Sequence, residues 1–255
     1  MNRKPIFDTV RTLLQRSFTA EEVRALDMAC DRAETPALEH ASADHRLGGL
    51  SARFESGGRG PGTVSAGTHD PGGPSYGTYQ FASRTGTCTR FLQQEGSVWA
   101  DRFAPHKPGE PGFGTIWKAI AAEEPERFGD AQHLFIERTH YRPVARAIKM
   151  ATGLDIDSRS AAVRDVIWSC AVQHGGAARI AGKAIAAADA HQSRADPSYD
   201  AALIEAIYRE RAAYVSALAE RPTVPAAQQR QLLSLVRKRY PMELAAAQAM
   251  LAASA

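Results

Sequence analysis

The chain has 255 residues, of which 44% are hydrophobic and 23% are charged, and its formal net charge at pH 7 is +3. The length allows one well-buried core, and the composition is that of an ordinary globular protein. So small a positive charge, with no run of Lys and Arg long enough to support nucleic-acid binding, excludes a strongly basic nucleic-acid-binding protein but tolerates an anionic polymer such as a cell wall.

Residues 1–46 are expected to form a helical extension, separate from a main domain at residues 47–255. Thr19 followed by Glu22 is a capping-box pattern, which is typical of a helix start. The basic residues near the N-terminus are not followed by a long apolar run or a small-residue cleavage site. We therefore expect no membrane span and no signal peptide, so that the protein is made in the cytoplasm and leaves it only by a dedicated route.

The main domain is expected to begin with a short helix. Leu47, Leu50 and Phe54 recur on one helical face, which predicts a helix that ends near Glu55. The glycine pair at 57–58 supplies a natural stop for it.

Between residues 63 and 81 the pattern changes from helix to strand. Side chains alternate along residues 76–81, and a Pro-Gly-Gly-Pro turn stands at residues 71–74. This combination predicts short strands around a turn, that is, a small antiparallel sheet or hairpin.

The chain after Thr85 is helix-like throughout. Apolar residues recur at helical spacing in six segments: 91–99, 112–122, 130–150, 160–174, 200–219 and 225–253. Residues 188–197 are expected to form a loop. The predicted fold class is therefore α+β, mostly α-helical. Three distant cysteines, Cys30, Cys88 and Cys170, indicate neither a disulfide framework nor a cysteine zinc site.

The stretch from Glu55 to Gln80 carries most of the functional information. Ten of the chain's twenty glycines lie between Gly48 and Gly77, where they allow positive φ angles and close approach of a ligand. Two carboxylates, Glu55 and Asp70, stand fifteen positions apart in this glycine-rich span. Hydrogen-bonding side chains are dense around them, namely Thr63, Ser65, Thr68, His69, Ser75, Tyr76 and Gln80.

Two carboxylates in unlike environments suit the hydrolysis of a glycosidic bond. One must donate a proton to the leaving oxygen, and the other must act on the anomeric carbon directly or through water. At the end of a helix, the partial negative charge of the helix dipole would raise the pKa of Glu55, and apolar neighbours would raise it further by desolvation. Backbone amides of a glycine-rich loop would instead keep Asp70 ionised.

The plain interpretation of the same stretch is a solvent-exposed turn or a linker, because acidic residues beside glycine are common there. No phosphate-binding loop, nucleophile elbow or zinc-protease motif occurs. His133 and His140 are expected on a helix surface rather than as metal ligands, and no metal or organic cofactor is implied. Gln173, at the end of an apolar helix, could face a cleft or simply belong to a helix end.

Four motifs in this region resemble the lysozyme-like, chitosanase-related domains of type VI secretion spike proteins and of some phage-associated peptidoglycan hydrolases. They read Glu55-Ser-Gly-Gly, Gly62-Thr-Val-Ser-x-Gly, Asp70-x-Gly-Gly and Ser75-Tyr-Gly-x-Tyr-Gln. The later Ala171-Val-Gln-His-Gly-Gly is similar as well, and the resemblance covers roughly residues 47–245.

The resemblance implies a lysozyme-like fold with a small sheet at the cleft, and cleavage of the glycan strand of bacterial cell wall. It maps the catalytic pair onto Glu55, as general acid, and Asp70, as general base. Four residues are expected to bind sugar: Thr68, Tyr76, Gln80 and Gln173. The true chitosanases have a different stretch between their two acids, so inverting stereochemistry does not carry over directly.

The expected biological role is that of an antibacterial effector. A secretion machine would deliver it to a target cell's periplasm, with a secretion spike protein and a cognate immunity protein as partners. A phage lysin that crosses the membrane through a holin fits the same observations. The alternatives are a chitosanase or other polysaccharide hydrolase, a non-catalytic wall-binding or phage-tail module, and a lytic transglycosylase, which would need only the Glu and would leave 1,6-anhydro ends.

Overall fold

The computed structural model describes residues 8–11, 16–19, 22–23, 26, 47–50, 60–67 and 72–254. By its internal contacts the chain divides into two compact units, Met1–His45 and Arg46–Ala255. In the first unit the N–H of Thr19 donates to Glu22 Oε2 at 2.9 Å, and the N–H of Glu22 donates to Thr19 Oγ1 at 3.2 Å. The capping box expected at these two residues is therefore confirmed.

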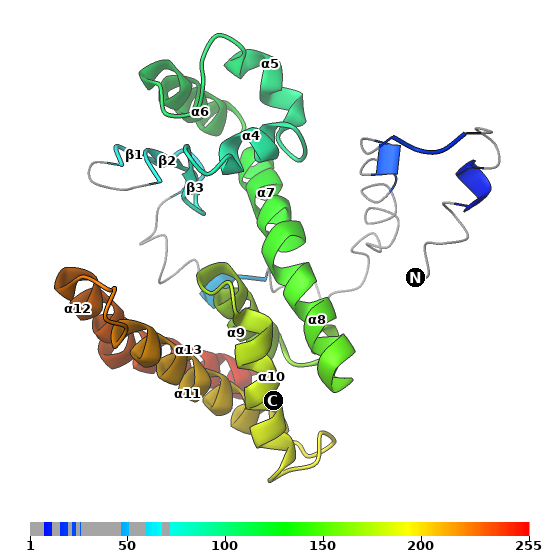
Figure 1. The fold of residues 1–255 in the computed structure, drawn as a ribbon, viewed down its shortest axis with the longest axis vertical. Helices are drawn as coiled ribbons and strands as arrows, with labels where there is room; N and C mark the ends of the chain where they lie inside the picture. The colour runs from blue at the N-terminus through cyan, green and yellow to red at the C-terminus, as the bar shows by residue number, and fades with distance from the viewer. Residues whose placement is uncertain are drawn as a thin grey trace. The chain divides into compact units, whose positions relative to one another are not determined.

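A three-stranded antiparallel sheet lies near the start of the second unit (Figure 1). Its strands are β1 (Val64–Ser65), β2 (Ser75–Tyr76) and β3 (Phe81–Ala82), in that order. Tyr76 pairs with Val64 on one side and with Phe81 on the other. The rings of Tyr76 and Phe81 are both buried and contact Trp117, so the sheet packs through its aromatic residues onto the helices.

The strands are shorter than the alternation along residues 76–81 predicts, because residues 77–80 form the turn between β2 and β3. Gly77 has a φ of 77° and Gln80 a φ of 54°, and both values lie in the left-handed region, which a strand residue does not adopt. The predicted small sheet is thus confirmed, but the predicted extent of its strands is wrong at this turn.

The described chain after the sheet is mainly helical. The α-helices are α4 (Thr87–Leu92), α5 (Ala100–Phe103), α6 (Pro111–Glu123), α7 (Pro125–Ile136), α8 (Arg142–Thr152), α9 (Ala161–Gln173), α10 (Ala177–Asp189), α11 (Tyr199–Ala219), α12 (Ala226–Ser234) and α13 (Tyr240–Ala253). Short 3₁₀ turns stand at η1 (Ser97–Trp99) and η3 (Ile156–Ser158), and π-helical segments at η2 (Glu137–Tyr141) and η4 (Leu235–Arg239).

Two of the predicted helices are interrupted by a π-helical segment. The helix expected at 130–150 runs as α7, η2 and α8, which follow one another as one rod in Figure 1. Pro143 has no N–H to donate to the carbonyl of Thr139, so an α-helical hydrogen bond cannot form there, which accounts for the π-helical turn. Pro241 accounts in the same way for η4, which divides the helix expected at 225–253.

Helix α10 was absent from the sequence-based expectations. Seven of its thirteen residues are alanine, and alanine gives little contrast between an apolar and a polar face. Its buried face holds Ile180 and Ile185 among small alanines, and it packs against α8 and α11. The loop expected at 188–197 is correct only after Asp189, where α10 ends.

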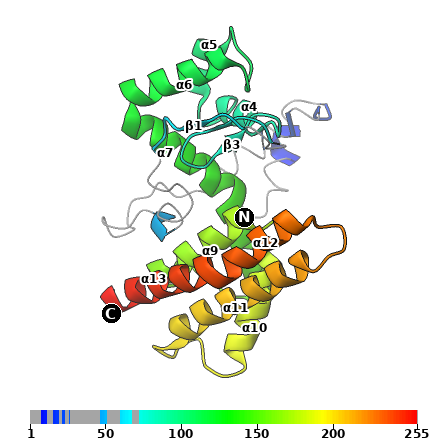
Figure 2. The same cartoon turned by 90° about the vertical axis from the view of Figure 1, so that its left-hand side faces the viewer.

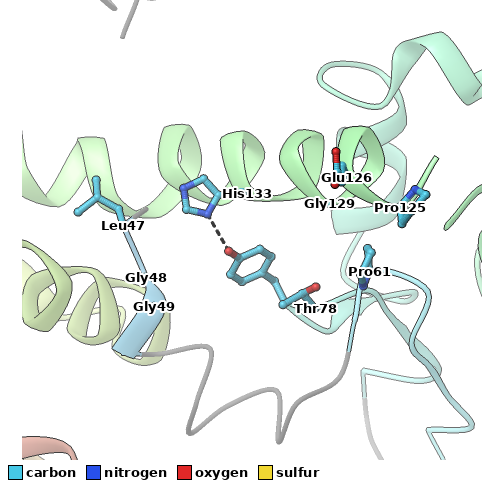
Figure 3. A pocket seen from close by; sticks show the side chains of 10 residues that line it. Leu47, Gly48, Gly49, Pro61, Thr78, Pro125, Glu126, Gly129 and His133 are labelled. Atoms are coloured by element: carbon cyan, nitrogen blue, oxygen red, sulfur yellow. Dashed lines mark hydrogen bonds between the residues drawn. The ribbon is translucent and has the colours of Figure 1, made fainter. Parts of the chain in front are cut away.

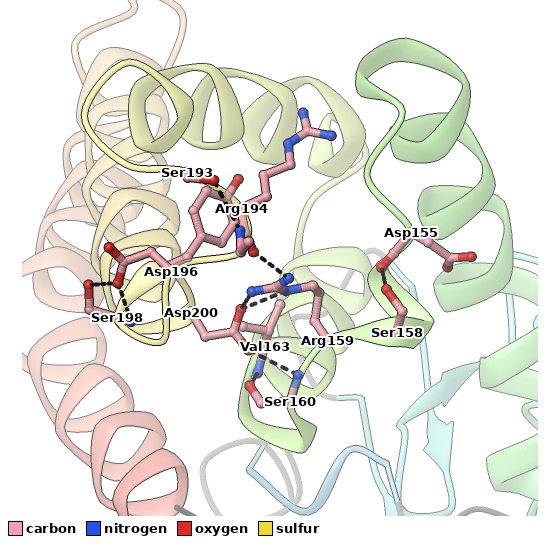
Figure 4. Close-up of polar contacts among 12 residues, drawn as sticks. Asp155, Ser158, Arg159, Ser160, Val163, Ser193, Arg194, Asp196, Ser198 and Asp200 are labelled. Atoms are coloured by element: carbon pink, nitrogen blue, oxygen red, sulfur yellow. Dashed lines mark hydrogen bonds and ion pairs between the residues drawn. The ribbon is translucent and has the colours of Figure 1, made fainter.

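Helix α9 is the centre of the helical part. It contacts α8, α10, α11 and α13, and α9, α11 and α13 lie side by side in Figure 2. Its start is held by Asp200 of α11, whose carboxylate accepts hydrogen bonds from the N–H of Ser160 at 3.0 Å and from Arg159 Nε at 2.7 Å (Figure 4).

The predicted fold class, α+β and mostly α-helical, is confirmed. Cys88 and Cys170 are buried free thiols, while Cys30 lies outside the described residues. In the part of the chain that the structure describes, every helix is too short or too polar to cross a membrane.

Candidate functional site

The two predicted catalytic residues belong to segments that the structure does not describe. Glu55 lies in residues 51–59, and Asp70 and Thr68 lie in residues 68–71. Their roles remain predictions. The residues on both sides of each segment are described, and they fix where the Glu55 segment (residues 51–59) and the Asp70 segment (residues 68–71) begin and end.

The Glu55 segment starts from a helix turn that is tied to α9. Gly49 and Leu50 are helical, and the N–H groups of Gly48 and Leu50 donate to the two carboxylate oxygens of Asp165 at 2.7 and 2.9 Å. Asp165 is fully buried on α9. A carboxylate at this position satisfies backbone donors that the first turn of a helix leaves unpaired, and it matches the positive end of the helix dipole.

The same face of α9 fixes the backbone at Gly48. Gly48 has a φ of 83°, and a Cβ there would lie 2.7 Å from Trp168 Nε1. Trp168 is fully buried, and its indole N–H has no hydrogen-bond partner among the described residues. Only glycine therefore fits above this ring, and Asp165 and Trp168 together define where the Glu55 segment begins.

The far end of the Glu55 segment is held by two other buried groups. The carbonyl of Pro61 accepts hydrogen bonds from Trp117 Nε1 at 2.7 Å and from Gln132 Nε2 at 3.1 Å. Gln132 also accepts a hydrogen bond from the N–H of Thr78 at 3.1 Å, so it joins the end of the segment to the β2–β3 turn. Both ends of the segment are thus fixed to α6, α7 and α9.

The Asp70 segment lies in the connection from β1 to β2, and the described residues on its two sides lie close together. A Cβ on Gly67, which has a φ of 61°, would lie 2.2 Å from the carbonyl carbon of Gly73. The carbonyl of Gly72 accepts a hydrogen bond from the N–H of Arg84 at 3.0 Å. The backbones of Gly67 and Gly73, which flank the Asp70 segment, therefore lie in contact.

A cavity of about 280 Å³ opens between these elements (Figure 3). It is lined by residues that precede and follow the Glu55 segment, by the β2–β3 turn and by α7. The lining residues are Leu47, Gly48, Gly49, Pro61, Thr78, Tyr79, Pro125, Glu126, Gly129 and His133. Pockets for small ligands span roughly 300–1,000 Å³, so this cavity has room for one ring-sized group.

Tyr79 and His133 form the polar wall of this cavity. The Tyr79 hydroxyl and His133 Nδ1 are 2.8 Å apart (Figure 3). The His133 ring stacks on Trp168 with centroids 4.6 Å apart and planes at 12°. His133 is only 8% exposed, so its expected helix-surface position was wrong; the neighbouring strand turn and α9 cover it.

His140 is half-buried rather than on an open surface, and burial followed by the charge of Arg90 lowers its pKa. Among the described residues, no group of three or more His, Cys, Asp or Glu side chains is placed to hold a metal ion. Helical periodicity gave no signal for His133, because the partner that buries it lies far away in the sequence.

Two of the residues expected to bind sugar lie in the hairpin. Tyr76 is 1% exposed, and its hydroxyl accepts a hydrogen bond from the N–H of Gly109 at 3.0 Å. Gln80 accepts from Ser75 Oγ at 2.8 Å and donates to the carbonyl of Gly77 at 3.0 Å, so its carboxamide closes the turn. The structure brings these two residues together but places neither in the lining of the cavity.

The third described member of that set, Gln173, belongs to a different cluster at the end of α9. Its Oε1 accepts hydrogen bonds from Arg211 Nη2 at 2.7 Å and from the Tyr240 hydroxyl at 3.0 Å. Arg211 in turn pairs with Glu243 at 3.2 Å, and both of these side chains are fully buried. We refer to these residues as the Arg211–Glu243 cluster.

His174 borders this cluster. Its Nε2 lies 3.1 Å from the Tyr240 hydroxyl. Burial, followed by the positive charges of Arg211 and Arg239, lowers the pKa of His174 to about 4, so the ring is neutral at pH 7.

The family model "Type VI secretion system spike protein VgrG3-like, C-terminal" matches residues 47–234 of the chain. This range includes both predicted catalytic residues, the cavity and Gln173. The chain is also 41% identical over 130 residues to the type VI secretion system spike protein VgrG3 of Vibrio cholerae serotype O1 (strain ATCC 39315 / El Tor Inaba N16961). That alignment covers 51% of this chain and 12% of the Vibrio protein, so the similarity concerns a small part of a much longer relative.

Proposed function

Because the chain belongs to the VgrG3-like C-terminal family of type VI secretion system spike proteins, we propose that it is a glycosidase that cleaves the glycan strand of bacterial peptidoglycan. The observation that carries the proposal is the position of the described residues on either side of the segment that holds Glu55. The flanks of the Glu55 segment, Gly48 and Pro61, line one cavity together with the β2–β3 turn.

Glu55 is the general acid of the proposed reaction. In the helix predicted for residues 47–55 it stands at the C-terminal end, where the helix dipole disfavours a second negative charge. Apolar neighbours in that helix add a desolvation penalty for the carboxylate. Both effects raise the pKa of Glu55, which keeps its proton available for the leaving oxygen of the glycosidic bond.

Asp70 is the general base. It follows β1 in a glycine-rich stretch of the sequence, and glycine allows backbone N–H groups to approach a carboxylate closely. Kept ionised in this way, Asp70 takes a proton from the water that attacks the anomeric carbon. Roughly 6.5–9.5 Å between the two carboxyl groups would leave room for that water and would give inversion.

The cavity is proposed to receive one sugar ring. Tyr79, His133, Thr78 and Glu126 supply polar groups on a wall that is otherwise made by glycine, proline and leucine. Such a mixture suits a pyranose, which has hydroxyl edges and apolar faces. Thr68, Tyr76, Gln80 and Gln173 remain the sugar-binding residues proposed from sequence, and the first two would act near Asp70 and the sheet.

Family membership supports a role as a cargo or part of a secretion spike. The proposed site of action is a competitor's periplasm, where peptidoglycan lies, and a cognate immunity protein would protect the producing cell. The spike and the immunity protein are therefore the proposed protein partners.

The proposed activity is tested by incubating the purified chain with peptidoglycan sacculi and, separately, with chitosan, and measuring released reducing ends. We expect release from sacculi and little from chitosan. Asp70→Asn should reduce kcat by roughly 10²–10⁴-fold, as loss of a catalytic base does. Binding to sacculi without any release of reducing ends would replace the enzyme by a wall-binding module.

A further inference from the structure

A second group of polar and aromatic side chains lies at the turn between α9 and α10, and it does not line the cavity. It consists of Gln173, His174, Arg179, Tyr214 and Tyr240, and we call it the α9–α10 corner. We propose that this corner binds a carboxylate-bearing sugar of the glycan strand. The inference rests on the proposed function, because it specifies which sugar the same substrate presents here.

The carboxamide of Gln173 has a defined orientation. Its Oε1 accepts hydrogen bonds from Arg211 and Tyr240 at 2.7 and 3.0 Å. An arginine can only donate, so the oxygen and not the nitrogen of the carboxamide must face Arg211. Nε2 therefore faces the other way on a half-buried side chain, and its two N–H groups can serve a ligand.

A chain of hydrogen bonds holds this orientation. The Tyr240 hydroxyl gives its only proton to Gln173, so its oxygen must accept from His174 Nε2 at 3.1 Å. Because His174 is neutral at pH 7, this contact fixes the ring as the Nε2–H tautomer. His174 donates to Tyr240, and Tyr240 donates to Gln173. The orientation of the carboxamide is therefore fixed in the absence of a ligand.

An exposed cation lies beside this group on an aromatic ring. The guanidinium carbon of Arg179 is 5.7 Å from the ring centroid of Tyr214, and the same ring meets His174 edge-on at 5.4 Å. Arg179 is exposed and forms no ion pair with any residue that the structure describes. Stacking leaves the N–H groups at the edge of a guanidinium able to bind a carboxylate in two-point fashion.

The surrounding charge is positive. Lys183 follows Arg179 by one helical turn and is also exposed, and the start of α10 adds the positive end of its dipole. The first acidic residue of α10 is Asp189, which already pairs with Arg194. Directed amide donors, an exposed guanidinium and a tyrosine ring together fit an acidic sugar, such as one with a lactyl ether or an attached peptide, better than a neutral sugar.

The test compares binding of two oligosaccharides by calorimetry, one from peptidoglycan with its carboxylates and one neutral chitooligosaccharide of equal length. The full chain carries Glu55→Gln so that neither ligand is consumed. Arg179→Gln removes the cation, and Gln173→Glu replaces the N–H donors while keeping an oxygen toward Arg211. Arg230→Gln, an exposed cation on α12 with no ion pair among the described residues, is the matched control for net charge.

We expect Arg179→Gln and Gln173→Glu each to weaken binding of the acidic glycan by about tenfold, which corresponds to the loss of one charge-assisted contact. The neutral ligand and the Arg230→Gln control should change less than twofold. Equal effects on both ligands, or none, would overturn the proposal. If Gln173→Glu does not fold, the exposed Arg179→Gln decides alone.

The outcome is separable from that of the proposed function. A wild-type chain that binds the acidic glycan but releases no reducing ends would refute the hydrolase and leave the binding site intact. An active wild type whose α9–α10 corner variants bind both ligands normally would refute the binding site alone.

Discussion

Replacing Glu243 by Gln should strongly destabilise the helical part of the protein. Glu243 and Arg211 are both fully buried and 3.2 Å apart. Glu243 also accepts hydrogen bonds from Ser169 at 3.3 Å and from Tyr208 at 3.2 Å, and it pairs with Arg239. The variant keeps the shape of the side chain but leaves the charge of Arg211 buried without a counter-charge.

The expected cost is about 3–5 kcal/mol, the range for breaking a buried ion pair by removing one partner. A globular domain has only about 5–15 kcal/mol of stability, so this loss is a large share of it. For a unit of this size, it corresponds to a fall in melting temperature of roughly 6–20 °C.

The assay is urea unfolding at pH 7, followed by far-ultraviolet circular dichroism. Glu123→Gln is the matched control, because Glu123 pairs with Arg102 at 2.6 Å while the two side chains are 55% and 39% exposed. Such a surface pair is worth about 0–1 kcal/mol. If Glu243→Gln costs no more than Glu123→Gln, the reasoning on the buried pair is wrong.

Three further predictions concern the site and its surroundings. Because the pKa of His174 is lowered to about 4 in the folded state, burial of its neutral ring contributes fully to stability above pH 6.5. As the pH falls from 6.5 toward 4, the unfolded chain takes up a proton at His174 while the folded protein does not, so this stability is lost. Wild type should therefore lose about 3 kcal/mol more than His174→Gln over that interval, and parallel curves from urea unfolding would contradict this. Gly77→Ala should destabilise by about 2 kcal/mol or more, because a Cβ would lie 2.2 Å from Gln132 Oε1 at a φ of 77°; an unchanged melting temperature would count against the turn geometry. Asp165→Asn should reduce kcat on sacculi with little change in KM, since it loosens the start of the Glu55 segment; an unaltered kcat in a folded variant would remove Asp165 from the account.

The features that the sequence predicted correctly, the capping box and the small sheet, depend on residues that are close together in the chain. The capping box at Thr19 and Glu22 is made by a few neighbouring atoms, and it was found where the pattern placed it. The sheet was also expected, since glycine and proline mark its turns. The turn at Gly77 and Gln80 was missed because alternating side chains are compatible with a strand, while a positive φ at a glutamine has no sequence signal.

Features that depend on distant partners were not visible in the sequence. The sequence pattern places His133 on the surface of a helix, whereas in the structure Trp168 and Tyr79 cover it. Asp165 is more than a hundred residues from the backbone groups that it binds. Gln173 was selected from a motif, but the reason for its orientation lies in Arg211 and Tyr240, which come from two other helices.

The central claim is that one side chain, Glu55, gives its proton to a glycosidic oxygen of the cell wall. Mass spectrometry of the muropeptides released from sacculi by wild type and by Glu55→Gln tests this claim most directly. We predict hydrolysed fragments with reducing ends from wild type and none from a Glu55→Gln variant that is folded by circular dichroism. Fragments released in equal amount by the folded variant would contradict the account.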